Sequence, residues 1–224
     1  MPARYPKAAR LRTIETNADL EAGIKALRRK CAVVRRMHER VGLPPLRRRP
    51  GGLAGLARIV IGQQVSVASA AAIWGRTEQV VGTFEADRLL ALTDDDWRAA
   101  GLSTGKIRTL RAIGAAVAEG RLDLDQLAAL DDEDIAARLT AISGIGPWTS
   151  DVYIMFCIGR ADGFAAGDLA LQVALQMASG MATRPRAQEL ADFAERWRPW
   201  RGVAARLLWD YYRIEKQGNS GVPV

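Results

Sequence analysis

The chain has 224 residues, a formal net charge of +7 and a pI of about 9.9. This length suits one large or two small domains, and with 49% hydrophobic residues the chain can bury a sizeable core. The first residues lack the apolar segment of a secretory signal, and no run approaches the roughly 18 apolar residues of a membrane span. We therefore expect a soluble, cytoplasmic protein with no membrane partner. Its basic surface favours nucleic acid as a partner, with a merely solvated arginine-rich face as the alternative.

The residue composition points to helices. Alanine and leucine dominate the apolar share and aromatic residues are only 6%, which favours helices over strands. Two cysteines, Cys31 and Cys157, are too few for a four-cysteine zinc or iron–sulfur site. We expect two buried, reduced thiols, no iron–sulfur cluster and an all-α fold.

Helical patterns can be followed along the first half of the chain. After a basic arm, a helix is expected from Asn17 to about Val41, capped by Asn17 or Asp19, and residues 42–50 form an exposed connector. A long helical stretch then runs to residue 82, and Gly62 near its middle indicates a break or a close contact. Further helices are expected at 86–91, 94–100, 104–119, 123–129 and 131–141.

The segment Ile142-Ser-Gly-Ile-Gly-Pro-Trp-Thr-Ser150 predicts a helix, a tight hairpin and a second helix. Gly144 and Gly146 permit the turn, Pro147 suits the first position of a helix, and the second helix should run from about Trp148 to Ile158. Backbone N–H groups at such a helix start bind anions, phosphates included. An ordinary pair of antiparallel helices is the alternative for the motif alone.

A lone acid, Asp168, opens the next predicted helix in the sequence GDLALQ. A helix N-terminus stabilises a negative charge, and aspartate there is also an ordinary N-cap, so position alone leaves both roles open. Two more helices are expected, one capped by Thr183-Arg184-Pro185 and one from Pro199 to about Lys216.

Four ordered segments resemble the helix-hairpin-helix (HhH-GPD) DNA glycosylase superfamily, and within it the alkylation-repair branch, DNA-3-methyladenine glycosylase II. They are RIVIGQQVSVASAA, GLSTGKIRTL, LTAISGIGPWTSDVYIM followed by GDLALQ, and ERWRPWRGVAARLLWDYY. The resemblance covers roughly residues 50–216 and implies a two-lobed helical fold. Residues 1–50 would be an arm and helix packed on the core, residues 51–216 the glycosylase core with the active site between its lobes, and residues 217–224 a polar tail.

The resemblance implies a monofunctional enzyme of base excision repair that acts on double-stranded DNA. Asp168 matches the catalytic carboxylate, which would stabilise an oxocarbenium-like sugar and orient water after base flipping. An alkylated purine of the 3-methyladenine or 7-methylguanine type is cationic and can leave without a general acid. Members that also cut the strand carry a lysine nucleophile where this chain has Trp148, which implies base release without strand cleavage.

Matching positions also imply a base pocket and a wedge. Trp148 and Trp209 would bind the cationic base through their ring faces, although tryptophans in amphipathic helices are commonly core residues. The pocket tyrosine of the family is replaced by Val152, which implies a roomier pocket. Gln64 matches the side chain that fills the gap left by the flipped nucleotide; a polar residue at a helix kink is the alternative.

The hairpin is implied to bind the DNA backbone. The phosphate-binding amides would lie near Gly144, Gly146 and Thr149. The family also binds a monovalent cation, Na⁺ or K⁺, through hairpin carbonyls. By position these are the carbonyls of Thr140, Ile142 and Ile145. Lys106 and the arginine-rich surface would add salt-sensitive affinity.

Apart from that cation no cofactor is expected, and the protein should act as a monomer, nucleoid-associated if bacterial. Two alternatives remain at this point. One is a helix-hairpin-helix glycosylase for another lesion, an oxidised or deaminated base. The other is a non-catalytic helix-hairpin-helix DNA-binding module, which Asp168 argues against.

Overall fold

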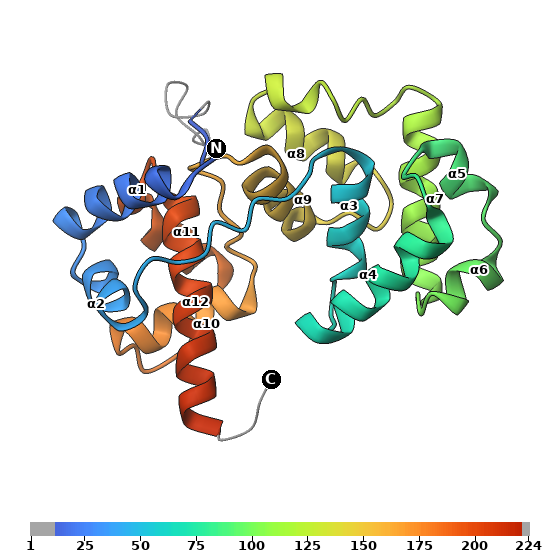
Figure 1. The fold of residues 1–224 in the computed structure, drawn as a ribbon. Coiled ribbons are helices and arrows are strands. Elements are labelled where there is room, and N and C mark those ends of the chain that lie inside the picture. Colours follow the sequence, from blue (N-terminus) through green and yellow to red (C-terminus); the bar gives the residue numbers. More distant parts are fainter. Residues whose placement is uncertain (1–11, 221–224) are drawn as a thin grey trace. The chain divides into compact units, whose positions relative to one another are not determined.

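The computed structural model describes residues 12–220, and for residues 217–220 the backbone alone. Within this range the chain forms twelve α-helices and no β-sheet (Figure 1). An isolated β-bridge joins Thr13 to Arg160. The predicted all-α fold is confirmed. No helix among residues 12–220 combines the length and the apolar character needed to cross a bilayer.

The helices belong to two compact units. The terminal unit comprises residues 1–48 and 154–224, as far as these are described, and the central unit comprises residues 49–153. The chain therefore leaves the terminal unit after Arg48 and re-enters it at Ile154. The predicted domain limits at residues 50 and 216 stay a prediction.

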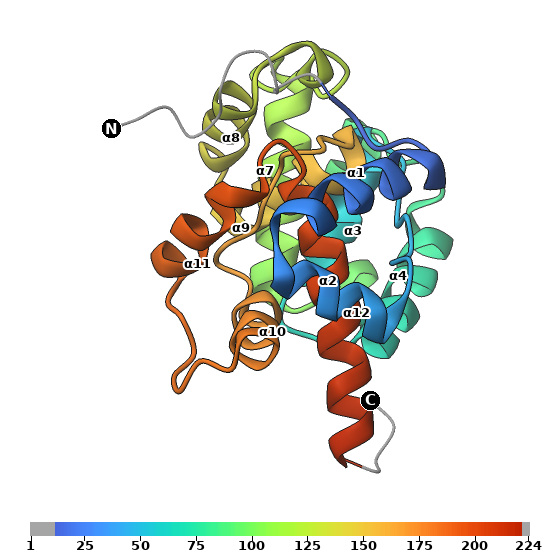
Figure 2. The ribbon, with the colours of Figure 1, turned by 90° about the vertical axis from the view of Figure 1, so that its left-hand side faces the viewer.

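In the terminal unit the last helix is the central packing element. Figures 1 and 2 both show the first helices of the chain beside the last one, and the last helix packs against α1, α2 and α10. Leu20, Val34, Leu171 and Leu207 are fully buried in this core. The helices of this unit are α1 (Asn17–Lys30), α2 (Ala32–Val41), α10 (Leu169–Ser179), α11 (Ala187–Ala194) and α12 (Arg201–Ser220).

The central unit is built around α3 and α7. The apolar sequence GLAGLARIVI makes α3 almost wholly buried, and α3 packs against α7 and α9. The predicted break at Gly62 is confirmed, since a loop separates α3 from α4. The helices of this unit are α3 (Gly52–Ile61), α4 (Val67–Val81), α5 (Ala86–Ala91), α6 (Asp94–Ala99), α7 (Thr104–Ala118), α8 (Asp132–Thr140) and α9 (Pro147–Tyr153).

The single helix predicted from Asn17 to Val41 is wrong. Cys31 has an extended backbone (φ −142°, ψ 113°) and separates α1 from α2. The cap is Thr16, one residue before the prediction, and its hydroxyl accepts a hydrogen bond from the Asp19 amide. Asp19 returns the interaction through its carboxylate, which completes a capping box.

Three smaller corrections concern helix ends. At 123–129 only a 3₁₀ turn over Leu127–Ala129 forms, because the Asp123 carboxylate accepts the amides of Asp125 and Gln126 and favours a turn. The cap of α11 is Arg186 with its partner Glu189, not the preceding Thr-Arg-Pro segment. The helix expected to end near Lys216 starts at Arg201 and continues to Ser220, so four residues of the predicted polar tail are helical.

Candidate active site

Asp168 is the N-cap of α10, as its position in the sequence predicted. Its Oδ1 accepts hydrogen bonds from the amides of Ala170 (2.9 Å) and Leu171 (3.1 Å). Its own amide donates to the carbonyl of Ala165 at 2.9 Å, and the side chain is part-buried. The carboxylate is therefore held by two backbone amides at the positive end of the helix dipole, and the main chain of Asp168 is held by Ala165.

A third donor reaches the same oxygen from another helix. Trp209 on α12 donates its indole N–H to Oδ1 of Asp168 at 3.0 Å. The residues are 41 apart in sequence, and both are only partly buried. A capping aspartate does not require such a partner, because the helix amides already satisfy Oδ1. The indole therefore gives Asp168 a position that capping alone would not specify.

The indole of Trp209 packs against a second aromatic ring. Its ring packs on Phe156, with ring centroids 5.5 Å apart and an interplanar angle of 39°. On Phe156 lies the guanidinium of Arg206, 4.7 Å from the ring centroid. Arg206 is fully buried, donates to the carbonyls of Leu46, Gly202 and Met155, and has its pKa lowered to about 9 by burial, so it stays charged at neutral pH.

The predicted hairpin is confirmed and lies in the central unit between α8 and α9. Gly144 has φ 88°, a conformation that favours glycine, and a Cβ added there would lie 1.9 Å from Oγ1 of Thr109 on α7. Pro147 is the first residue of α9. The helical backbone continues past Tyr153 through a π-helical turn at Ile154–Ile158, so the expected extent to Ile158 is also confirmed.

The start of α9 is tied to the end of α3 within the central unit. The Gln63 side-chain amide donates to Oγ1 of Thr149 at 2.8 Å, and Thr149 is buried. Lys106 donates to the carbonyl of Ile61 at 2.6 Å, and burial lowers the pKa of its ammonium group. Part of the donor capacity of Lys106 thus serves the C-terminus of α3, in addition to any role on DNA.

Gln64 follows Gln63 in the loop after α3, and its side chain is exposed. Its φ is 56°, so it adopts the left-handed conformation with a side chain that disfavours it. Two exposed apolar residues come next, Val65 and Val67, the latter with 89% of its surface accessible. An accessible, strained residue beside exposed apolar side chains is typical of a ligand-contact loop.

The predicted pocket residues of α9 differ in exposure. Trp148, the second residue of the helix, is part-exposed, whereas Val152 is 5% exposed. Tyr153 is 1% exposed and its hydroxyl accepts a hydrogen bond from the Gly52 amide at 3.0 Å. Tyr153 therefore serves the packing of α9 onto α3 and does not take the place of the tyrosine missing at position 152.

The carbonyls predicted to hold a monovalent cation have the right donor chemistry. Thr140 is the last residue of α8, so its carbonyl has no partner further along that helix. The carbonyl of Ile142 accepts the amide of Ile145 at 3.0 Å and keeps a second lone pair. Carbonyl oxygens suit a hard cation such as Na⁺ or K⁺.

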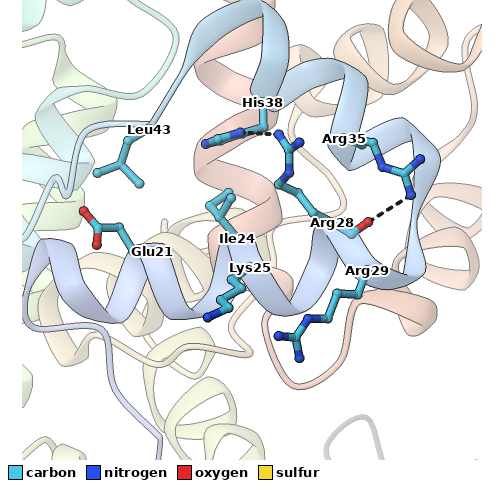
Figure 3. Close-up of a pocket in the computed structure, with 8 residues that line it drawn as sticks. All are labelled: Glu21, Ile24, Lys25, Arg28, Arg29, Arg35, His38 and Leu43. Carbon is cyan, nitrogen blue, oxygen red and sulfur yellow. Dashed lines mark hydrogen bonds between the residues drawn. The ribbon is translucent and has the colours of Figure 1, made fainter.

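A separate basic groove lies between α1 and α2 (Figure 3). It has a volume of about 540 Å³ and contains none of the predicted site residues. Its charges are partly engaged, because Arg28 donates to Nδ1 of His38 at 2.6 Å and pairs with Glu39, and Arg35 donates to the Arg28 carbonyl. The basic residues that line it are Lys25, Arg28, Arg29, Arg35 and His38.

Sequence reasoning missed the residues that support Asp168. The sequence alone predicts no role for Arg206 or Phe156. The spacing of Arg206 and Trp209, three positions apart in a helix, is the one local signal that they share a face. The role of Thr109 against Gly144 has no such signal, since α7 and the hairpin meet through the tertiary fold.

Comparison with known proteins points the same way as these features. Residues 57–199 match the family described as HhH-GPD superfamily base excision DNA repair protein. A Mycobacterium tuberculosis protein described as "Probable bifunctional transcriptional activator/DNA repair enzyme AlkA" is 35% identical over 162 residues, which are 68% of this chain and 32% of that protein. The chain thus spans about a third of that relative's length.

Two solved structures are similar over nearly the whole chain. One is a Schizosaccharomyces pombe 3-methyladenine DNA glycosylase (Mag1) in complex with abasic DNA, with a TM-score of 0.80 and 25% identity, covering 91% of this chain and 100% of that one. The other is a DNA-3-methyladenine glycosidase from Bacillus halodurans, with a TM-score of 0.72 and 28% identity, covering 94% and 93%.

Proposed function

The chain belongs to the HhH-GPD superfamily of base excision DNA repair proteins, and on this premise we propose that it is a monofunctional DNA glycosylase that releases alkylated purines from double-stranded DNA. The observation that carries the proposal is the setting of Asp168, whose Oδ1 is held by two helix amides and by Trp209. A pure DNA-binding module gains nothing from a fixed carboxylate near phosphates.

The chemistry asked of Asp168 is electrostatic. Cleavage of the N-glycosidic bond leaves positive charge on the sugar, and a fixed carboxylate lowers the energy of that charge without reorganising during the reaction. The same group can orient a water molecule toward C1′. Because an N-alkylated purine is already cationic, it departs as a neutral base and no protonating acid is required. Neutral, undamaged purines should therefore be poor substrates.

The base would be selected by aromatic faces. A cationic ring gains roughly 0.5–2 kcal/mol from each tryptophan face that it stacks on. We assign this part to Trp148 and to the ring of Trp209, whose N–H is already directed to Asp168. Val152, in place of an aromatic residue, leaves room for larger alkylated bases. Trp148 also occupies the place of the lyase lysine, which supports base release without strand scission.

The remaining machinery would hold and deform the DNA. Backbone amides at Gly144, Gly146 and Thr149 would bind a phosphate at the start of α9, and the carbonyls of Thr140, Ile142 and Ile145 would hold a Na⁺ or K⁺ beside it. Such a cation supplies positive charge next to the phosphate. Gln64 would fill the space vacated by the flipped nucleotide, which its exposure supports. We expect the protein to work as a monomer on chromosomal DNA.

The test is direct product analysis. The protein is incubated with methylated duplex DNA, and the released bases are separated by chromatography while the strands are examined on a denaturing gel. We expect free 3-methyladenine or 7-methylguanine and intact strands until alkali is added. If only oxidised or deaminated bases were released from matched substrates, the enzyme would act on that class of lesion and not on alkylated purines. If no base were released from any substrate, the protein would instead be a non-catalytic DNA-binding module.

A further inference from the structure

Arg47 carries an unusual backbone conformation in the connector between α2 and α3. Its φ is 53°, and among the described residues Gln64 is the only other non-glycine with a positive φ. A residue with a Cβ avoids this region unless surrounding structure imposes it, and such residues concentrate at ligand-binding positions. Arg47 therefore needs an explanation beyond a solvated loop.

The residues on both sides of Arg47 are held by hydrogen bonds within the terminal unit. The carbonyl of Leu46 accepts a hydrogen bond from Nε of Arg206 at 3.0 Å. Arg48 donates to the carbonyls of Phe156 at 2.9 Å and Cys157 at 2.7 Å, and its guanidinium pairs with Glu15 at 2.9 Å. With both neighbours fixed, the left-handed turn at Arg47 determines the direction in which its Cα–Cβ bond leaves the backbone.

The Arg47 side chain is accessible and has no hydrogen-bond or salt-bridge partner within residues 12–220. Protein around the guanidinium lowers its pKa through desolvation, Asp210 opposes that shift, and Arg213 adds to it. Asp210 is itself paired with Arg213 at 2.6 Å. Asp210 is therefore shared between two arginines and forms no ion pair with Arg47.

Arg213 shares a helix face with the support of Asp168. Arg206, Trp209, Asp210 and Arg213 are spaced i, i+3, i+4 and i+7 along α12, which places them on one side of the helix. Trp209 from this row donates to Asp168. A nucleotide whose sugar faces Asp168 would carry its phosphates within reach of long side chains on the same row.

We propose that Arg47 and Arg213 form a phosphate-binding site for the DNA backbone next to the nucleotide that Asp168 acts on. This site, the Arg47–Arg213 pair, lies in the terminal unit and is distinct from the hairpin of the central unit. It rests on the proposed function, because it assumes that DNA is the ligand. The turn at Arg47 then serves to aim one guanidinium at a phosphate oxygen, a contact that arginine makes well.

The experiment measures DNA affinity as a function of salt for three variants at one position. Arg47→Ala removes the charge, Arg47→Gly removes the charge and relieves the positive φ, and Arg47→Lys keeps the charge. Arg29→Ala on α1 (Figure 3), an exposed arginine away from this row, is the control for loss of one positive charge. The probe is a short duplex that contains a stable abasic-site analogue, and thermal unfolding is recorded for each variant.

Loss of one phosphate contact should reduce the magnitude of the slope of log affinity against log salt by about 0.9. Between 50 and 200 mM salt, the affinity of such a variant should therefore fall about threefold less than that of wild type. We expect this for Arg47→Ala and Arg47→Gly, while Arg47→Lys and Arg29→Ala keep the wild-type slope. Arg47→Gly should unfold at or above the wild-type temperature, which separates lost binding from lost folding. Unchanged slopes in both Arg47→Ala and Arg47→Gly, with wild type binding normally, would overturn this site and leave the proposed function intact.

The position of the contact is tested by neutralising single phosphates. A methylphosphonate is placed in turn at each linkage flanking the abasic analogue, and its effect is measured with wild type and with Arg47→Ala. At the contacted linkage the two changes should be non-additive, because each removes the same interaction. Additivity at every flanking linkage contradicts the placement. Failure of wild type to bind the duplex at all would instead refute the proposed function.

Discussion

The indole N–H of Trp209 donates a 3.0 Å hydrogen bond to Oδ1 of Asp168, which joins the middle of α12 to the residue that opens α10. Trp209 in turn lies on Phe156, and Phe156 lies beneath the buried guanidinium of Arg206. The orientation of the candidate catalytic carboxylate is therefore set by the packing of α12 as well as by its own helix.

Trp209→Phe separates the two roles of this side chain. Phenylalanine keeps a ring against Phe156 but removes the N–H donor. Hydrogen bonds to charged groups are worth about 1.5–3 kcal/mol, so single-turnover base release should slow by roughly ten- to hundredfold. Affinity for abasic DNA should change little. Trp200→Phe, at a buried tryptophan before α12, is the control. An unchanged rate of base release with weaker substrate binding would mean that Trp209 acts through its ring and not through its N–H group.

Gly144→Ala should destabilise the hairpin. The substitution places a Cβ at φ 88° and 1.9 Å from Oγ1 of Thr109, so both backbone strain and overpacking oppose it. We expect a loss of about 2–4 kcal/mol in the free energy of unfolding, measured by urea titration. Gly146→Ala is the matched control, because the space around Gly146 is open. Equal stability of the two variants contradicts this view of the turn.

Substitution of Gln64 by glycine should change the stability and the activity of the protein in opposite directions. Gln64→Gly relieves the positive φ and should raise the free energy of unfolding by about 1 kcal/mol. If the side chain fills the gap in the duplex, the same variant should excise alkylated bases roughly tenfold more slowly from duplex DNA, with little change on single strands. Gln64→Leu should retain excision. Equal rates for all three proteins would leave Gln64 as a kink residue only.

His38, the one histidine of the chain, predicts a pH dependence of stability. Burial lowers its pKa below the ordinary 6.5, and the Arg28 guanidinium adds to the shift while Glu39 opposes it. The unfolded chain therefore binds the proton more readily, so the contribution of His38 to the free energy of unfolding is fully present above about pH 6.5 and is lost as pH decreases below it.

His38→Gln should flatten this dependence between about pH 7.5 and pH 5, as measured by urea midpoints. The carboxyl groups whose pKa values are lowered by hydrogen bonds, such as Asp19 and Glu189, act mainly in a more acidic range and are the same in both proteins, so the difference between the two slopes reports His38. An identical slope in wild type and His38→Gln would contradict the assignment.

Local chemistry explains what could be predicted from the sequence. Gly144, Pro147 and Asp168 act through their own backbone conformation or the helix they begin, so the hairpin and the start of α10 were predicted correctly. The errors also have local causes. The Asp123 side chain competes for helix amides, and the extended backbone at Cys31 interrupts a sequence whose apolar spacing continues without a gap.

The supports of the candidate site could not be predicted in this way. The bond between Trp209 and Asp168 joins residues 41 apart, and Arg206 contributes because it is fully buried, which its charge does not suggest. Thr109 contacts Gly144 only through the packing of α7 beside the hairpin. Each of these relationships depends on the tertiary fold.

The central claim is that Asp168 supplies the carboxylate for base release, and Asp168→Asn tests it most directly. Asparagine caps a helix about as well as aspartate, so α10 and DNA binding should persist while the charge is lost. In single-turnover assays on a duplex with alkylated purines, we expect release to fall by roughly 10²–10⁴-fold with unchanged affinity for abasic DNA. Release of 3-methyladenine by Asp168→Asn at the wild-type rate would contradict the account.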